Sequence, residues 1–511
     1  MKREVNQLKA GTVLSYVIMV VNTIIPLLYT PIMLRMLGQD EYGLIGLCNS
    51  VISYLSLLTL GLGSTIHRFY MQYLAKNDTI MVEKTVGLFT LIFSVIAAIV
   101  VVVGCSLTLF TDTLFSQGLT AAEMSKMKTL MVIMSIGSGF SLLAVPFSSI
   151  VVAHERFVFQ KIFSLITTIA TPLFNLAALY LGFASVGMAI VGTMLSVITL
   201  LVNIVYCTKT LNTRPRFRNL PFAMLKEIFA FTLVVFVSTI ADLLYWATDK
   251  VLIGALIGTA AVAIYNIGTT FNAIMQQMSS AISGVFAPRV NRMVFSDQPI
   301  EVISELMIRV GRIQYLLLSL ILSGFVVFGY SFILLWAGDG YEEAFAVALL
   351  TMIPMVIPLI QNIAFNTIVA MNKHKFRSNL YVILAVVNVI TTYLLIPYMG
   401  IVGAALCTFV VFLVGHGVIM NWFYYKKIGL DILNFWKNIF KMTVIPGILT
   451  IAGLLFQQYV YKISDLISFA LGVVIYTSVF CVLSWLFTMN AYEKQLILGL
   501  LGKIIPKKGV R

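Results

Sequence analysis

The chain has 511 residues, of which 60% are hydrophobic and only 11% charged, and its mean hydropathy is +0.99. This composition excludes a soluble globular protein, because too little polar surface exists to cover a chain of this length. The formal charge of +14 could suit nucleic acid. The basic residues fall instead in short connections between apolar segments, as orientation in a membrane requires, so we expect no nucleic-acid partner.

Fourteen apolar segments follow one another along the chain. Most are long enough to cross the ~30 Å hydrocarbon core, which takes ~20 apolar residues in a helix. The sequence therefore predicts an all-α polytopic membrane protein of about 14 transmembrane helices. The segments are 12–34, 42–66, 85–110, 128–152, 159–182, 185–207, 224–256, 260–287, 310–335, 344–371, 378–398, 401–425, 443–460 and 466–488.

Lysine and arginine are divided very unequally between the connections on the two sides of the membrane. If alternate connections are cytoplasmic, 29 of the 34 Lys and Arg residues lie on the cytoplasmic side. Lys250 lies inside a segment, and the outer side receives the other four: Arg35, Lys126, Lys128 and Lys462. Cytoplasmic connections of membrane proteins carry an excess of basic residues. We therefore expect both termini in the cytoplasm.

Sequence landmarks recur at a nearly constant spacing. Ala153–Phe157 (AHERF) and Asn372–Phe376 (NKHKF) each precede a long apolar span, and Gly403 lies 216 residues after Gly187. Leu37-Gly38 and Ile257-Gly258 are 220 apart, and Arg68 and Arg289 are 221 apart. Six spans intervene, so both copies keep the same orientation, as in transporters with parallel repeats. We predict an N-terminal lobe (1–223), a C-terminal lobe (224–428) and a helix pair with a basic tail (429–511), the two six-helix lobes forming a V around a central cavity.

Several short motifs point to a family. They are Gly11–Ser15 (GTVLS), Pro31, Leu37–Leu44 (LGQDEYGL), Leu60–Gly63 followed by Arg68, and Asn77-Asp78. With the six-plus-six-plus-two layout, the chain resembles the polysaccharide transporter branch of the multidrug/oligosaccharidyl-lipid/polysaccharide exporter superfamily. The resemblance implies a flippase in a bacterial cytoplasmic (inner) membrane, which moves undecaprenyl-diphosphate-linked oligosaccharide to the outer leaflet by alternating access. It implies a role in surface polysaccharide biosynthesis, with a polysaccharide polymerase as a potential partner. In related lipid II flippases the last helix pair borders a groove for the polyprenyl tail. The resemblance implies the same role for residues 443–488.

The seventh segment carries the chemistry that an apolar span normally lacks. Asp242 and Asp249 are seven residues apart and share a helical face with Tyr245 and Trp246, and Lys250 follows. Ionisable residues within a span usually face a wet cavity or a partner. We expect these five residues to line the substrate cavity, with Asp242 as the carboxylate that couples transport to H⁺ or Na⁺. The alternative is that the carboxylates make structural hydrogen bonds between helices.

A diphosphate cargo requires cations, preferably the planar guanidinium of arginine. Arg35 near the outer end of the first segment, and the repeat-related pair Arg68 and Arg289 at inner ends, are the candidates for the cavity beside Lys250. Each arginine could equally be a basic anchor at the membrane surface. The five cysteines show no paired spacing and no GxxxxGK[ST] motif occurs, so we expect no metal, no cofactor and no ATPase site.

Two other functions fit parts of the sequence. A cation-coupled multidrug exporter of the same superfamily would also use an acidic, aromatic cavity, but the polysaccharide-branch motifs and the two extra spans oppose it. A membrane glycan polymerase or ligase typically acts through a large external loop, whereas the longest predicted outer connection, 111–125, has about fifteen residues. We therefore expect a transporter rather than an enzyme.

Overall fold

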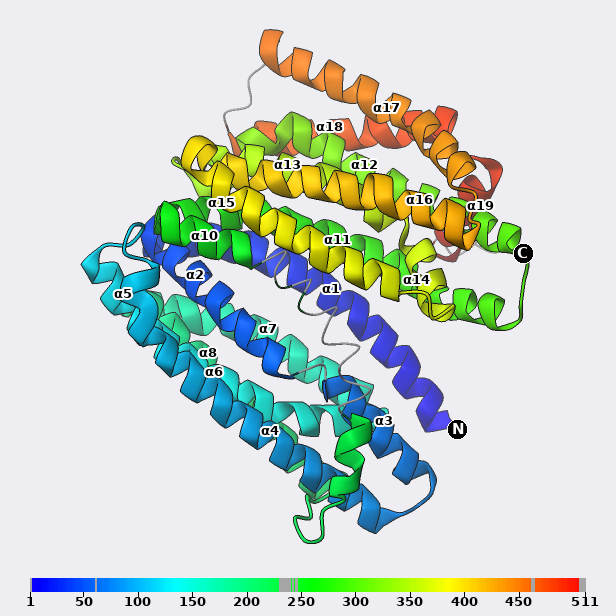
Figure 1. Cartoon of the computed structure of the whole chain (residues 1–511). Coiled ribbons are helices and arrows are strands. Elements are labelled where there is room, and N and C mark those ends of the chain that lie inside the picture. The colour runs from blue at the N-terminus through cyan, green and yellow to red at the C-terminus, as the bar shows by residue number, and fades with distance from the viewer. Residues whose placement is uncertain are drawn as a thin grey trace, which may run out of the picture. The chain divides into compact units, whose positions relative to one another are not determined.

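A computed structural model describes residues 2–59, 62–228, 240, 243, 247–460 and 465–504. These residues are helical or in short connections, and none of them forms a strand (Figure 1). The predicted all-α fold is confirmed.

The helices are given with the labels of Figure 1. In the first part of the chain they are α1 (Lys2–Leu37), α2 (Gln39–Leu55), α3 (Leu62–Ala75), α4 (Thr79–Leu107), α5 (Thr111–Leu114), α6 (Ala121–Ala153), α7 (Phe157–Tyr180), α8 (Ala184–Val205) and α10 (Thr248–Leu256). There follow α11 (Thr259–Phe295), α12 (Ile300–Ala337), α13 (Glu343–Ile360), α14 (Asn362–Ala370), α15 (Lys375–Phe412), α16 (Asn421–Phe423), α17 (Ile432–Tyr459), α18 (Leu466–Leu483) and α19 (Ala491–Ile504).

Eleven helical stretches among the described residues are long and apolar enough to cross a membrane. One of them, Lys375–Ile428, has 54 residues and covers the eleventh and twelfth predicted segments, which meet at a kink at Gly400. About half of the seventh predicted segment falls outside the described residues. The long helix α11 is not among the eleven, because its Asn, Gln, Ser and Thr side chains lower its hydropathy. The predicted total of fourteen spans stays a prediction.

The backbone turns repeat along the chain as the sequence landmarks do. Left-handed backbone angles (φ between +47° and +133°) recur in pairs whose members lie 216 to 220 residues apart. The pairs are Gly38 with Gly258, Asn77 with Asp297, Glu155 with Asn372, Ala184 with Gly400, and Asn212 with Gly429. Non-glycine residues seldom adopt this conformation, so its recurrence is independent of the apolar pattern. It supports the internal repeat inferred from the sequence.

By contact, the chain forms two compact units, one comprising residues 1–266 and 381–404 and the other 267–380 and 405–511. These units differ from the predicted lobes, because α10, the start of α11 and part of α15 pack with the N-terminal helices. The predicted lobe boundaries rest on the repeat and stay a prediction.

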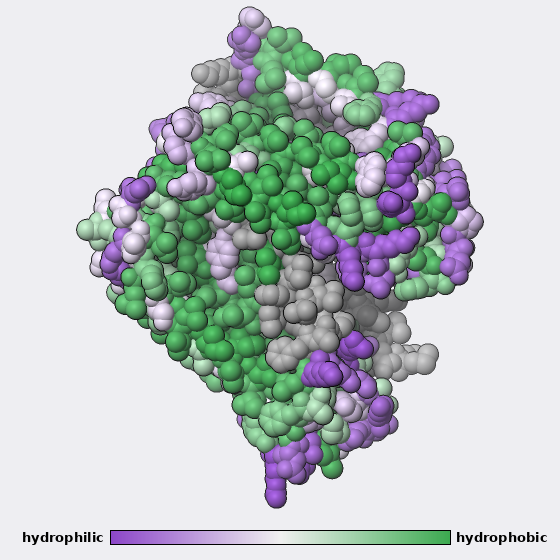
Figure 2. Space-filling view, viewed as in Figure 1, coloured by the Kyte–Doolittle hydropathy of each residue, from purple (hydrophilic) through white to green (hydrophobic). Residues whose placement is uncertain are grey.

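Helix α6 is the centre of the first unit, where it packs against both α4 and α8 (Figure 1). A Cβ atom at Gly104 of α4 would lie 2.1 Å from Ser135 Oγ of α6, so glycine lets these helices approach closely. The exposed faces of α4 and α6 are covered with apolar side chains (Figure 2), among them Val95, Ile99 and Val102 of α4. Such faces suit contact with lipid tails.

Helix α2 packs closely against the α10–α11 corner of the same unit through two glycines. A Cβ atom at Gly43 would lie 1.8 Å from the Thr259 carbonyl oxygen, and one at Gly46 would lie 1.8 Å from Asn266 Nδ2. Thr259 Oγ1 also donates a 2.5 Å hydrogen bond to Glu123 Oε1 of α6, while Lys126 pairs with Glu41. The close approach of the Thr259 carbonyl to α2 explains why glycine is needed at Gly43 in the Tyr42-Gly43-Leu44 motif.

In the second unit, α12 packs against α13, α17 and α18. Its residue Arg312 forms a bidentate ion pair with Glu493 of α19, at 2.6 Å (Nε to Oε1) and 3.0 Å (Nη2 to Oε2). Arg312 also donates to the Thr488 carbonyl at 3.0 Å, and the two charged side chains are only 9% and 2% exposed. The pair fastens the C-terminal helix α19 to the membrane-spanning helices.

Glu493→Gln should lower the stability of the second unit by about 3 kcal/mol, because breaking a buried ion pair leaves the remaining charge uncompensated. The measurement is the midpoint of thermal unfolding in detergent. Glu305→Gln is the matched control, since Glu305 pairs with Arg309 on an exposed surface where ion pairs contribute about 0–1 kcal/mol. Equal midpoints for the two variants would contradict a stabilising role for Arg312–Glu493.

Candidate functional site

Asp249 is a buried carboxylate in the first unit. It lies in the first turn of α10 and its residue is 2% exposed. The neighbouring Thr248 bonds through its hydroxyl to Tyr54 OH of α2 at 2.5 Å, and Gly254 packs against Leu47 of the same helix. These contacts fix the orientation of α10 and direct Asp249 toward α11 and α15.

Three side chains from two other helices donate hydrogen bonds to the Asp249 carboxylate. Tyr265 OH of α11 reaches Oδ2 at 2.7 Å, while Asn388 Nδ2 and Thr392 Oγ1 of α15 reach Oδ1 at 3.2 and 3.4 Å. Asn388 and Thr392 are 0% exposed and Tyr265 is 2% exposed. Neutral donors thus reach both oxygens of the carboxylate, and Lys250 interacts electrostatically with it.

This arrangement offers a carboxylate, an amide, a hydroxyl and a phenol within one small buried volume. Asn388 Oδ1 is buried and has no hydrogen-bond partner among the described residues. Oxygen atoms of this kind are the ligands that hard cations prefer, and a buried carboxylate can alternatively bind a proton. The cluster can therefore bind a small cation through its oxygen atoms, or its carboxylate can bind H⁺.

The structure places the sequence-predicted residues in different settings. Asp242, Tyr245 and Trp246 lie outside the described residues, so the predicted stripe and the coupling role of Asp242 stay predictions. Asp249 lies within the hydrogen-bonded cluster of the first unit. Lys250 is half-buried beside it on α10.

The three predicted arginines are all exposed. Arg35 lies in the last turn of α1, Arg68 on α3 with its guanidinium 5.9 Å from the Phe69 ring centre, and Arg289 on α11 in the second unit. Their role in binding a diphosphate stays a prediction.

Sequence reasoning missed Tyr265, Asn388 and Thr392, the partners of Asp249. A signal for two of them was present: Asn388 and Thr392 lie four residues apart in an apolar span, so they share one helical face. Their pairing with Asp249 could not be read from the sequence, because 139 residues separate Asn388 from Asp249.

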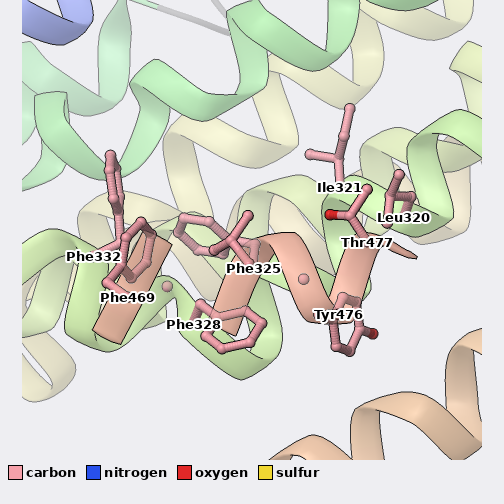
Figure 3. A pocket seen from close by; sticks show the side chains of 11 residues that line it. Leu320, Ile321, Phe325, Phe328, Phe332, Phe469, Tyr476 and Thr477 are labelled. Carbon is pink, nitrogen blue, oxygen red and sulfur yellow. The ribbon is translucent and has the colours of Figure 1, made fainter. Parts of the chain in front are cut away.

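The second unit contains an apolar pocket of about 300 Å³ between α12 and α18. Figure 3 shows aromatic rings of α12 and of α18 around it. Phe328 meets Phe469 and Tyr476 edge-on, at centroid distances of 6.2 and 5.5 Å, while Gly324 leaves space in the wall. None of the described side chains that line this pocket is charged. Its chemistry suits a hydrocarbon chain.

Replacing Asp249 with leucine should destabilise the first unit by about 3 kcal/mol, because three buried donors lose their acceptor and each unsatisfied group costs about 1–3 kcal/mol. Asp249→Asn keeps an acceptor for Tyr265 and should cost less. Thermal unfolding in detergent gives the comparison. Asp112→Asn, at a side chain that is 60% exposed, should leave the midpoint within a degree or so of the unmodified chain. An unchanged midpoint in Asp249→Leu would rule out the buried cluster.

Comparison with known proteins gives a family and a fold. A family model described as "polysaccharide biosynthesis protein" matches residues 8–294, more than half of the chain. A search of curated proteins gives no match. Among solved structures, the lipid II flippase MurJ in an inward closed conformation is similar over 93% of this chain and 98% of its own, with a TM-score of 0.71 and 12% identity.

Two further transporters share the fold as well. An inward-facing multidrug resistance transporter of the MATE family, in the MOP superfamily, covers 82% of this chain and 99% of its own, with a TM-score of 0.64 and 15% identity. A MOP superfamily transporter from Pyrococcus furiosus covers 83% and 96%, with a TM-score of 0.58 and 14% identity. The resemblance found in the sequence motifs is confirmed. The chain belongs to the polysaccharide biosynthesis protein family, and it is a multi-pass membrane protein with the fold seen in transporters of the MOP superfamily.

Proposed function

We propose that this protein is a flippase for undecaprenyl-diphosphate-linked oligosaccharide. It moves the cargo from the cytoplasmic to the outer leaflet of a bacterial cytoplasmic membrane, with both termini in the cytoplasm. The observation that carries the proposal is the match of the polysaccharide biosynthesis model to 8–294 on a fold shared with a lipid II flippase. The protein performs transport and no covalent chemistry, and it supplies a polymerase on the outer side.

The apolar pocket between α12 and α18 supports a lipid-linked cargo. A polyprenyl chain is pure hydrocarbon, and the ring-lined pocket of the second unit matches it in chemistry. A multidrug exporter is the second candidate, since MATE transporters share the fold. The lipid II flippase covers 93% of the chain against 82% for the MATE transporter, which favours the flippase.

Transport requires an energy source, and the buried carboxylate offers a means of coupling. Asp249, with its amide and hydroxyl neighbours, binds H⁺ or Na⁺ in one state of the cycle and releases it in the other. Asp242, which the sequence predicts as the coupling carboxylate, remains a second candidate for this role. One elementary charge that crosses 100 mV contributes ~2.3 kcal/mol, so one or two ions suffice to bias a cycle of alternating access between two six-helix lobes.

The diphosphate is assigned to the cationic residues Arg35, Arg68, Arg289 and Lys250. A guanidinium holds phosphate oxygens through two parallel hydrogen bonds, and the exposure of the three arginines leaves them accessible to a head group. Tyr245 and Trp246 are assigned to sugar faces and hydroxyls in the same cavity.

The proposal is tested in proteoliposomes that contain a fluorescent undecaprenyl-diphosphate-linked oligosaccharide. The unmodified chain should accelerate movement of the label between leaflets, and an imposed Na⁺ or H⁺ gradient should increase the rate. Asp249→Asn and Asp242→Asn should lose the gradient dependence, while Asp112→Asn should keep it. If the unmodified chain moves no oligosaccharide lipid, the flippase proposal is wrong. If Asp249→Asn keeps the full gradient effect, Asp249 has no coupling role.

Filling the apolar pocket should weaken recognition of the long prenyl tail. A Cβ atom at Gly324 makes ordinary contact with the Tyr476 ring at 3.8 Å, so Gly324→Leu fits while occupying the pocket. We expect the KM for undecaprenyl-linked cargo to rise about fivefold, equivalent to about 1 kcal/mol, with little change for a farnesyl-linked analogue. Gly447→Leu on α17 is the control, since nothing lies within 4 Å of a Cβ there. An equal rise for both tails would contradict tail binding.

A further inference from the structure

A second cavity, of about 380 Å³, lies inside the first unit among α2, α6, α7 and α8. Its volume falls in the range of small-molecule binding sites. Its walls are rich in hydroxyl and amide groups, contributed by Asn49, Ser141, Thr171, Asn175, Thr193 and Ser196. Each of these residues lies well inside its predicted span, at a depth where water is scarce and polar groups are costly.

The hydrogen bonds around this cavity use the hydroxyl protons of its walls. Thr171 donates to the Thr167 carbonyl at 2.7 Å, Thr193 to the Ile133 carbonyl at 3.1 Å and Ser196 to the Gly192 carbonyl at 3.0 Å. Ser141 in turn donates to Ser196 Oγ at 2.9 Å. A hydroxyl has one proton and two lone pairs, so these groups retain acceptor capacity after donating.

Asn175 adds a stronger acceptor. Its residue is 8% exposed and lines the cavity, and its side chain interacts with the Tyr29 hydroxyl of α1, while its Oδ1 accepts no hydrogen bond from the described residues. A buried amide oxygen without a donor costs free energy, so a ligand that supplies a proton there gains affinity. Asn49 and Ser141 line the cavity and are exposed, so a ligand can reach them.

None of the described side chains around this cavity is charged. A diphosphate would meet oxygen acceptors and no cation, and a cationic drug would find no carboxylate. A neutral ligand that carries many hydroxyl donors fits both facts. Helix packing through small polar residues explains close contact of these helices, but it does not explain an unpartnered Asn175 oxygen beside open space.

We propose that this hydroxyl-lined cavity holds a neutral sugar residue of the cargo, separately from the groups that bind its diphosphate. The inference rests on the proposed flippase function and adds a subsite to it. Sugar hydroxyls donate to Asn175 Oδ1 and to the hydroxyl lone pairs of α6, α7 and α8. The cavity thereby recognises one sugar residue of the saccharide, while the rest of the cargo is recognised by other parts of the chain.

The test compares matched lipids on the purified full-length chain by native mass spectrometry. The probes are farnesyl diphosphate alone and farnesyl diphosphate linked to N-acetylglucosamine, glucose or galactose. At least one sugar-bearing probe should bind about tenfold more tightly than the bare lipid. Asn175→Leu should abolish that gain while leaving the affinity for farnesyl diphosphate unchanged. Ser141→Val, at an exposed position, is the second variant and should reduce the gain if Asn175→Leu does not fold.

Asn203→Leu is the matched control, because Asn203 of α8 is also buried, at 6% exposure, but does not line the cavity. It should keep the tenfold gain. The proposal is overturned if no sugar-bearing probe exceeds the bare lipid, or if Asn175→Leu and Ser141→Val weaken both kinds of probe equally or neither. Binding of the bare lipid without a sugar gain refutes this subsite alone, whereas binding of no lipid at all refutes the flippase proposal as well.

Discussion

Hydrocarbon offers no hydrogen bonds, and this constraint governs where polar side chains lie in the protein. Arg312 is matched by Glu493, and the Asp249 carboxylate receives donors from Tyr265, Asn388 and Thr392. Thr171, Thr193 and Ser196 donate to backbone carbonyls, and Ser141 donates to Ser196. These groups pair with a different helix or with their own, so the polar pairs also specify which helices pack together.

A lipid-linked saccharide combines three chemistries: an apolar tail, an anionic diphosphate and a neutral sugar. The described residues offer a separate environment for two of them, an aromatic pocket in the second unit and a hydroxyl-lined cavity in the first. The buried carboxylate near α10 is distinct from both. Under the proposed function, this separation lets cargo recognition and ion coupling change independently during evolution.

The sequence predicted the helical class and the repeat because both depend on local patterns: apolar length, charge bias and turn residues. The left-handed backbone angles at Gly38, Asn77 and Ala184 recur at their repeat mates and support the repeat. The partners of Asp249 were not predictable, because contacts between spans depend on the rotation of each helix, which a nearly uniform apolar sequence barely encodes. Gly43 was recognised as part of a motif, but its reason, the Thr259 carbonyl against α2, required the fold.

The wide sequence separation within the Asp249 cluster has a consequence for biosynthesis. Tyr265 follows Asp249 by 16 residues, but Asn388 follows by 139. At about 5–20 residues per second, the ribosome adds that stretch in roughly 7–28 s. Throughout this interval the nascent helix α10 carries a carboxylate whose second partner helix does not yet exist. The apolar residues around it must outweigh the ~2.5–3.5 kcal/mol cost of inserting the charge, so the sequence of α10 is selected for membrane entry as well as for the finished site.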